Sequence, residues 1–111
     1  MDAELKANWV KALRSGEYKQ AIDELRNFNG FCCLGVLLDI SGHGHWGYEG
    51  YIVNDGYDEI CLKKNIGWYV TNFGMNLKQE RTLINMNDGE KEFEGNPRSF
   101  AQIADYIEAK L

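Results

Sequence analysis

The sequence predicts one small α+β domain over residues 1–111, with three main helices packed on a small antiparallel sheet built from the middle of the chain. The length is close to the commonest domain size and allows one hydrophobic core. Apolar residues recur at helical spacing near both ends, and strand-forming residues gather between them. The longest apolar run, Phe31–Ile40, holds one charged residue in ten, so we expect the core to close around it.

The first expected helix covers residues 2–15 and ends at Gly16. Asp2 is placed to cap its start. Its apolar positions fall on one helical face: Leu5, Trp9, Ala12 and Leu13. A short second helix is expected over residues 17–26, although the following Asn27-Phe28-Asn29-Gly30 is typical of a turn.

The core helix is expected over Cys32–Ser41, with Gly42 as its C-terminal stop. A buried strand is the alternative for this run. Its length near ten and its two β-branched residues favour the helix.

The middle of the chain predicts the sheet. Tyr51–Val53 and Tyr57–Cys61 are expected to pair as a hairpin across an Asn54-Asp55-Gly56 turn. Residues 62–67 suit a helical turn, and Trp68–Thr71 suits a third strand.

A further short helix is expected over Leu77–Asn87, followed by an acidic, solvated loop over Gly89–Asn96. The last helix, Ser99–Leu111, has the clearest pattern, because Ser99 and Gln102 form a capping box before one apolar stripe. Both terminal helices are expected to contact the core helix.

Net charge, the length of the apolar run and the number of cysteines argue against several classes of protein for this sequence. The net charge is −5 with an isoelectric point near 5.0, and the basic residues are scattered apart from the Lys63-Lys64 doublet, so direct nucleic-acid binding is not expected. A ten-residue apolar run is too short for a membrane span, which takes about 20 residues. Three cysteines, two of them adjacent, form a poor disulfide framework. Without a recognisable targeting segment, the expected location is a reducing cytoplasm.

Cys32 stands at the expected start of the core helix, where the helix dipole would lower its pKa and favour a nucleophilic thiolate. The histidines available as a base, His43 and His45, lie about one helix length away. Buried structural thiols are therefore the preferred reading. His43 and His45 could bind zinc together with Cys32, Cys33 or Cys61, but the spacing favours a plain exposed loop, so no metal or cofactor is expected.

Acidic side chains alternate along the expected loop: Asp88, Glu90, Glu92 and Glu94. Their order does not match a helix–loop–helix calcium site, so solvated surface, able to meet a basic partner, is the preferred reading. The pair Asn87-Asp88 is interpreted as a helix end and turn, with a carboxylate held near Cys32 as the alternative.

Six of the fourteen aromatic residues fall within 24 positions of the middle segment, and a small sheet cannot cover them all. Tyrosine and tryptophan dominate binding hot spots. The predicted contact surface is therefore this aromatic half together with the acidic loop: Trp46, Tyr48, Tyr51, Trp68, Asp88, Glu90, Glu92 and Glu94.

Four stretches carry a family resemblance: residues 9–16 (WVKALRSG), 31–37 (FCCLGVL), 83–88 (LINMND) and 99–108 (SFAQIADYIE). They resemble a family of short proteins carried by tailed phages and prophages. Members often have another cysteine where Leu38 stands here. Their connection between the Asn-Asp pair and the Ser-Phe of the last helix is usually shorter than residues 89–97 of this chain, which makes the acidic loop a candidate for a feature specific to this member.

The resemblance implies a phage-encoded accessory protein that acts in the host cytoplasm. With no credible catalytic set, the predicted function is to bind and inhibit a host protein, for example a nucleic-acid-binding defence effector such as a CRISPR effector. Two alternatives stay open: a cysteine-dependent hydrolase using Cys32, and a small-molecule or nucleotide-binding module with a pocket between the core helix and the sheet.

Overall fold

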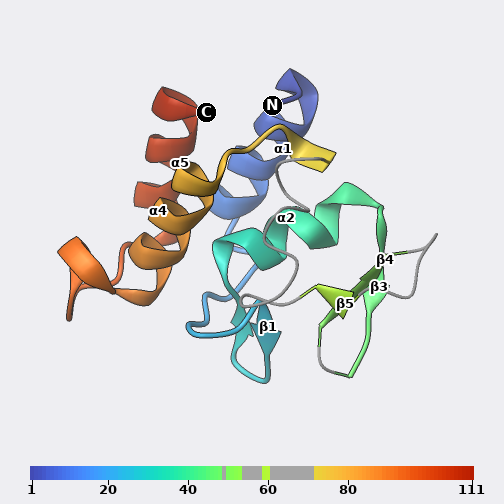
Figure 1. The fold of residues 1–111 in the computed structure, drawn as a ribbon, viewed down its shortest axis with the longest axis horizontal. Helices are drawn as coiled ribbons and strands as arrows, with labels where there is room; N and C mark the ends of the chain where they lie inside the picture. The colour runs from blue at the N-terminus through green and yellow to red at the C-terminus, as the bar shows by residue number, and fades with distance from the viewer. Residues whose placement is uncertain (49, 54–58, 61–71) are drawn as a thin grey trace.

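The computed structural model describes residues 1–48, 50–53, 59–60 and 72–111. Over these residues, four α-helices, one 3₁₀ turn and two small antiparallel sheets form an α+β fold (Figure 1). In chain order the elements are α1 (Ala3–Arg14), β1 (Arg26–Asn27), β2 (Gly30–Phe31), α2 (Cys33–Ser41), β3 (Gly44–Trp46), β4 (Tyr51–Val53), β5 (Glu59–Ile60), α4 (Leu77–Asp88), the 3₁₀ helix η1 (Lys91–Phe93) and α5 (Phe100–Lys110).

The core helix α2 lies between the other helices and the strands (Figure 1). All of its residues from Cys33 to Leu38 are buried, as expected of a helix that is apolar all round. Trp9 of α1 donates its indole N–H to the Cys33 carbonyl oxygen at 2.9 Å, which joins α1 to α2. α1 and α4 pack directly on α2, whereas α5 packs mainly on α1 and α4. The expected contact with the core helix is thus confirmed for α1, whereas α5 packs mainly on α1 and α4.

The helix ends follow the predicted signals. The Asp2 carboxylate accepts from the Leu5 amide at 2.8 Å, and Gly42 ends α2 with a φ of 74°. The Ser99–Gln102 capping box opens α5. α4 ends at Gly89, whose φ of 71° is in the left-handed region that favours glycine. No helix in the described ranges has the length and apolar character needed to cross a membrane.

The short helix predicted over residues 17–26 is wrong, because residues 19–21 run beside β2 and residues 22–25 are bends. The Ala21 amide donates to the Phe31 carbonyl oxygen and the Phe31 amide donates to the Lys19 carbonyl oxygen, each at 2.8 Å. These bonds place the segment beside β2, and Arg26 then enters β1. The approach depends on glycine, because a Cβ on Gly30 would meet the Lys19 carbonyl oxygen at 1.9 Å. Pairing with a distant strand therefore overrides local helix propensity.

The second sheet has the order β3–β4–β5. Tyr51 pairs with Ile60 across β4 and β5, which confirms the predicted antiparallel pairing, and the predicted turn at residues 54–56 lies outside the described residues. β3 was not predicted. The helical turn expected over residues 62–67 and the strand expected over Trp68–Thr71 also lie outside the described residues.

A single buried amide ties three parts of the fold together. Asn87, fully buried on α4, accepts at its Oδ1 from the Cys33 amide and from Gln20 Nε2, both at 3.1 Å. Its Nδ2 donates to the Ala21 carbonyl oxygen at 2.8 Å and to Asp88 Oδ1 at 2.9 Å. The side chain thus pairs an otherwise unpaired N–H at the start of α2 and fixes the extended segment beside it. The predicted role of Asn87 in turning the chain is only part of its function in the fold.

Replacing Asn87 with alanine is expected to lower the free energy of unfolding by about 3 kcal/mol, because it leaves the Cys33 amide and the Ala21 carbonyl without these partners. Urea denaturation followed by circular dichroism measures the change. Asn85→Ala is the matched control on the same helix, where Asn85 is half-buried, and it should shift stability far less. Equal losses in the two variants would contradict the role given to Asn87.

Candidate functional site

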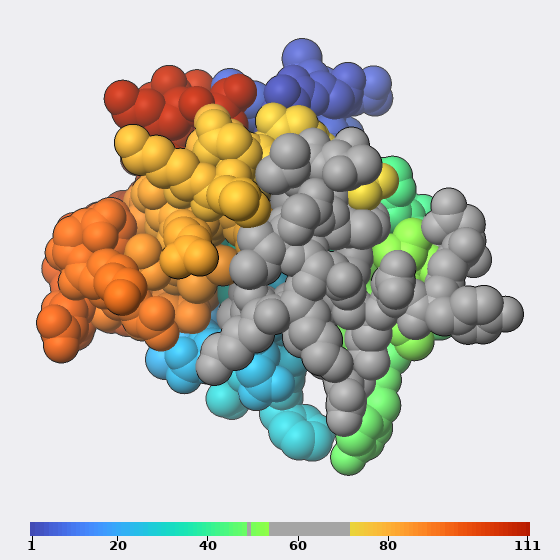
Figure 2. Space-filling view, in the orientation of Figure 1, coloured from blue at the N-terminus to red at the C-terminus, as the bar shows by residue number. Residues whose placement is uncertain are grey.

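Two hairpin tips project side by side at one edge of the molecule, where Figure 2 shows them in cyan and green along the lower border. The tip between β1 and β2 carries Phe28, and the tip between β3 and β4 carries Tyr48. Both side chains are fully exposed, with relative accessibilities of 110% and 102%. The Asn27 side chain accepts from the Asn29 amide at 2.8 Å, and the Gly47 amide donates to the Gly50 carbonyl oxygen at 2.7 Å. The two turns are therefore defined by their own hydrogen bonds.

A cation stacked on two rings joins the bases of these hairpins. The Arg26 guanidinium lies 5.7 Å from the centre of the Phe31 ring and 5.5 Å from that of the Trp46 ring. The two rings pack edge to face, with their centres 5.7 Å apart. Phe31 also packs against Tyr18 at 5.1 Å. Such ring–ring and cation–ring contacts hold the two tips in a defined relation.

Asp39 fixes the polar ends of this cluster. It is an exposed residue of α2, and its carboxylate accepts from the Tyr18 hydroxyl at 2.5 Å and from Trp46 Nε1 at 2.9 Å. Burial, and then the hydrogen bond to Asp39, raise the pKa of Tyr18 to about 12, so the phenol stays protonated and keeps donating. We call the whole group the aromatic edge: Tyr18, Arg26, Phe28, Phe31, Asp39, Trp46 and Tyr48.

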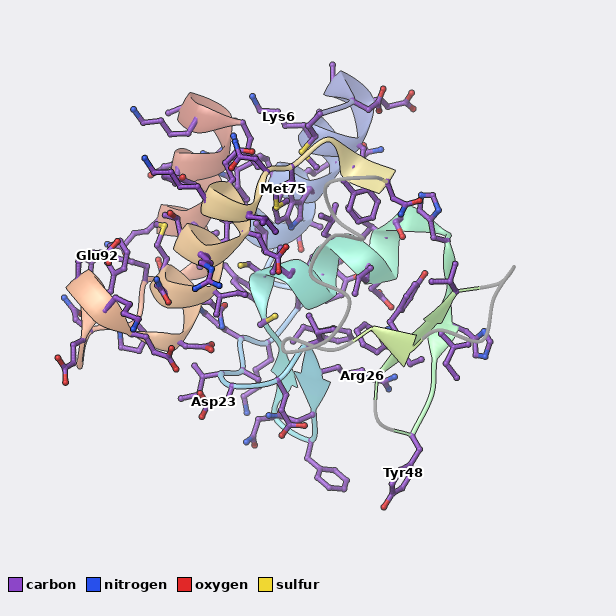
Figure 3. The ribbon with its side chains drawn as sticks, viewed as in Figure 1. Lys6, Asp23, Arg26, Tyr48, Met75 and Glu92 are labelled. Carbon is purple, nitrogen blue, oxygen red and sulfur yellow. The ribbon has the colours of Figure 1, made fainter. Side chains whose placement is uncertain are left out.

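A second group of side chains, all carboxylates, comes from the segment before β1 and from the end of α4 and the residues after it. Oxygen atoms of Asp23, Asp88 and Glu90 all lie within 4.8 Å of one another. Asp23 comes from the extended segment, and its amide donates to Asp88 Oδ1 at 3.1 Å. Glu92 and Glu94 are exposed on and after η1, and Figure 3 shows Glu92 and Asp23 on the same side of the molecule. We call these five residues the acidic edge: Asp23, Asp88, Glu90, Glu92 and Glu94.

The predicted contact residues have different fates. Tyr48, Glu90, Glu92 and Glu94 are exposed, Trp46 and Asp88 are half-buried, and Trp68 lies outside the described residues. Tyr51 is 1% exposed and packs against Trp46 with ring centres 5.2 Å apart, so its assignment to the contact surface is wrong. Alternation along β4 turns Tyr51 into the core.

The sequence reading missed Phe28, Arg26 and Asp39. The available signal was Phe28 itself, because a large apolar residue inside an Asn-Phe-Asn-Gly turn has little chance of burial. Arg26 was missed because it was assigned to the predicted helix over residues 17–26, whereas it lies in β1. Asp39 was visible as the one charge in the apolar run, but its two donors, Tyr18 and Trp46, come from segments on opposite sides of α2 in the chain.

The cysteines at the start of α2 do not have the predicted thiolate character. Cys32 and Cys33 are 2% and 0% exposed. Burial outweighs the hydrogen bond that the Gly35 amide donates to the Cys32 sulfur at 3.4 Å, and it raises the pKa of Cys32 to about 12. The pKa of Cys33 is raised for the same reason. The expectation of a lowered pKa at Cys32 is therefore wrong, and within the described ranges the buried structural reading fits both thiols.

Potential metal ligands give one close group within the described part of the chain, formed by Asp23, Asp88 and Glu90. The histidine–cysteine set considered for zinc is not brought together there: His43 and His45 are exposed beyond the C-terminal end of α2, and Cys32 and Cys33 are buried at its start. Cys61 lies outside the described residues.

One buried carboxyl stands apart from both edges. Glu80 on α4 is 2% exposed, and its Oε2 has no hydrogen-bond partner within the described part of the chain. Burial raises the pKa of Glu80 to about 7, against a smaller opposing effect of Arg81. The folded protein therefore holds a proton on this group that an unfolded chain releases near pH 4.5.

A family model described as a domain of unknown function matches residues 1–68. No match was found among curated proteins or among solved structures. The matched range includes every residue of the aromatic edge, whereas the acidic edge lies outside it except for Asp23. The two edges thus occupy different parts of the sequence: the aromatic edge lies within the matched family region, and the acidic edge lies mostly beyond it.

Cys32 and Cys33 are expected to resist alkylation in the folded protein. With a pKa of about 12 in place of 9.0, the thiolate fraction of Cys32 at pH 8 falls by about 10³-fold relative to an unfolded chain. Iodoacetamide labelling in a Cys61→Ser background, followed by mass spectrometry with and without urea, measures this ratio. Rapid, selective labelling of folded Cys32 would instead support the hydrolase alternative.

Protonation of Glu80 is expected to make stability fall with pH. Since its folded pKa is raised, the stabilising proton is fully present below pH 4.5 and lost as the pH rises to about 7. Glu80→Gln should therefore gain stability over wild type as the pH increases through this window, by about 3 kcal/mol at most above pH 7. Urea denaturation between pH 4 and pH 8 compares the two proteins. The control is Glu92→Gln at an exposed position, where a parallel gain would show that burial of Glu80 is not the cause.

Proposed function

We propose a function for this chain, which belongs to the DUF8296 family of domains of unknown function, from the chemistry of its aromatic edge. The chain works by binding another protein. The observation that carries this proposal is the full exposure of Phe28 and Tyr48 on two hairpins whose bases are held together by Arg26 and Asp39.

Exposing a phenylalanine in water forgoes the roughly 2 kcal/mol that burial of its ring would give. The tips contribute nothing to the core, while the residues beneath them are ordered by stacking and hydrogen bonds. Binding then loses little conformational entropy, because the supporting residues already have their bound arrangement. Exposed aromatic side chains on an ordered base are the usual composition of an interaction hot spot.

The acidic edge adds a preference for the charge of the partner. Asp23 of this cluster lies three residues before Arg26 in the chain, so a partner that covers Phe28 and Asp23 together is expected to present basic residues next to an apolar pocket. Together with the resemblance to phage accessory proteins, this supports a host-directed inhibitor in the host cytoplasm. A nucleic-acid-binding defence effector, such as a CRISPR effector, has a basic surface of the required kind.

The two alternatives have less support. A hydrolase based on Cys32 requires a thiolate that burial disfavours. A small-molecule or nucleotide-binding module remains a prediction with a simple test, a thermal shift on addition of nucleotides or signalling metabolites.

Substitution of the tips is expected to abolish capture of the partner while leaving the fold intact. The tagged wild-type chain should retain one dominant protein from host lysate, and Phe28→Ser and Tyr48→Ser should each weaken its binding about 30-fold or more. Quantitative mass spectrometry followed by titration against the purified partner measures the loss. Leu77→Ser is the matched control, since Leu77 is 51% exposed at the start of α4.

Charge reversal at Glu90 or Glu92 should reduce the association rate and its salt dependence more than it reduces the lifetime of the complex.

A partner retained equally by the wild-type chain and by both tip variants would refute the role of the aromatic edge. Retention of no protein at all would refute the binding function itself.

A further inference from the structure

An open groove of about 640 Å³ runs along α1 and is bordered by Glu108 of α5. Its apolar residues are small, since Ala3, Ala7 and Val10 line it on α1. Cations border it, and Figure 3 shows Lys6 at the opposite end of the molecule from Asp23. The groove is therefore a surface of different character from the aromatic and acidic edges.

Charges of opposite sign lie on its two sides. α1 contributes Lys6, Lys11 and Arg14, and α5 contributes Glu108 with Asp105 next to it. Arg14 bridges the helices, at 2.8 Å from Glu108 and 2.6 Å from Asp105. Both carboxylates stay accessible, with side chains 54% and 74% exposed, so each can accept a second cation.

This charge pattern is complementary to itself. A two-fold axis along the groove places the basic α1 of one copy over the acidic α5 of the other, whereas an axis across the groove would place like charges together. Lys11 lies between the levels of Lys6 and Arg14, which both reach Glu108, so Lys11 of one copy comes over Glu108 and Asp105 of the second copy. In other relative orientations, two copies that each carry a net charge of −5 repel one another.

We propose that the groove between α1 and α5 is a self-association surface, occupied by a second copy of this chain in a two-fold, charge-matched arrangement. The small side chains of α1 allow close approach of the second copy. Since no large apolar side chain lines the groove, the dimer is weak, with a Kd on the order of 100 µM at low salt. The aromatic and acidic edges stay exposed in this dimer, so each dimer presents two copies of the proposed binding surface.

Sedimentation equilibrium of the full chain from about 10 µM to about 1 mM tests the proposal. The mass should rise from the monomer value of 12.7 kDa towards twice that value at low salt, and less at high salt. Lys11→Glu should weaken association about tenfold or more, because each dimer contains the contact twice. Lys91→Glu on η1 makes the same charge change at an exposed position away from the groove and is expected to leave the Kd unchanged.

A chain that stays monomeric up to about 1 mM would overturn the proposal. Equal weakening by Lys91→Glu and Lys11→Glu would also overturn it. None of these results depends on the partner of the aromatic edge.

Discussion

The buried side chain of Asn87 is the constraint on which the rest of the structure depends. One amide serves the start of the core helix, the extended segment that lines it and the end of α4. The first turn of any helix has backbone N–H groups without partners inside the helix. A helix as apolar as α2 can be enclosed on every side only if these groups find partners elsewhere in the protein. Asn87 supplies that partner from a point 54 residues further along the chain. The segment it fixes leads directly into β1, so the position of the aromatic edge follows from the same contact.

Local signals were sufficient for most of the helices. Asp2, Gly42, Ser99 and Gly89 each mark a helix end through the hydrogen bond or backbone angle that such an end requires, and the sequence reading places these ends to within a residue or two. Residues 17–26 could not be read in this way, because their conformation depends on backbone pairing with Phe31 and on the amide of Asn87. The packing of α5 on α1 and α4 was missed for a similar reason, since an apolar stripe indicates that a helix is buried and not which neighbour buries it.

The candidate site was predicted in kind more than in detail. Aromatic crowding correctly pointed to the middle segment as a source of exposed rings, and Tyr48 is one of them. Which rings are exposed depends on the register of β4, and this register places Tyr51 in the core. Arg26 and Asp39 act by bridging segments that only the tertiary structure brings together, so neither residue type nor spacing identified them. The acidic cluster likewise gained Asp23 from a segment expected to be helical.

The hairpin tips have a consequence for how this protein can change over time. Phe28 and Tyr48 contribute nothing to the packed interior, and their turns are defined by Asn27, Gly47 and Gly50. Most replacements at the two tip positions therefore carry little risk to folding, while each one alters the surface offered to a partner. Under the proposed binding function, recognition and stability are encoded by different residues. The exposed tips can therefore vary in sequence while the packed interior is kept.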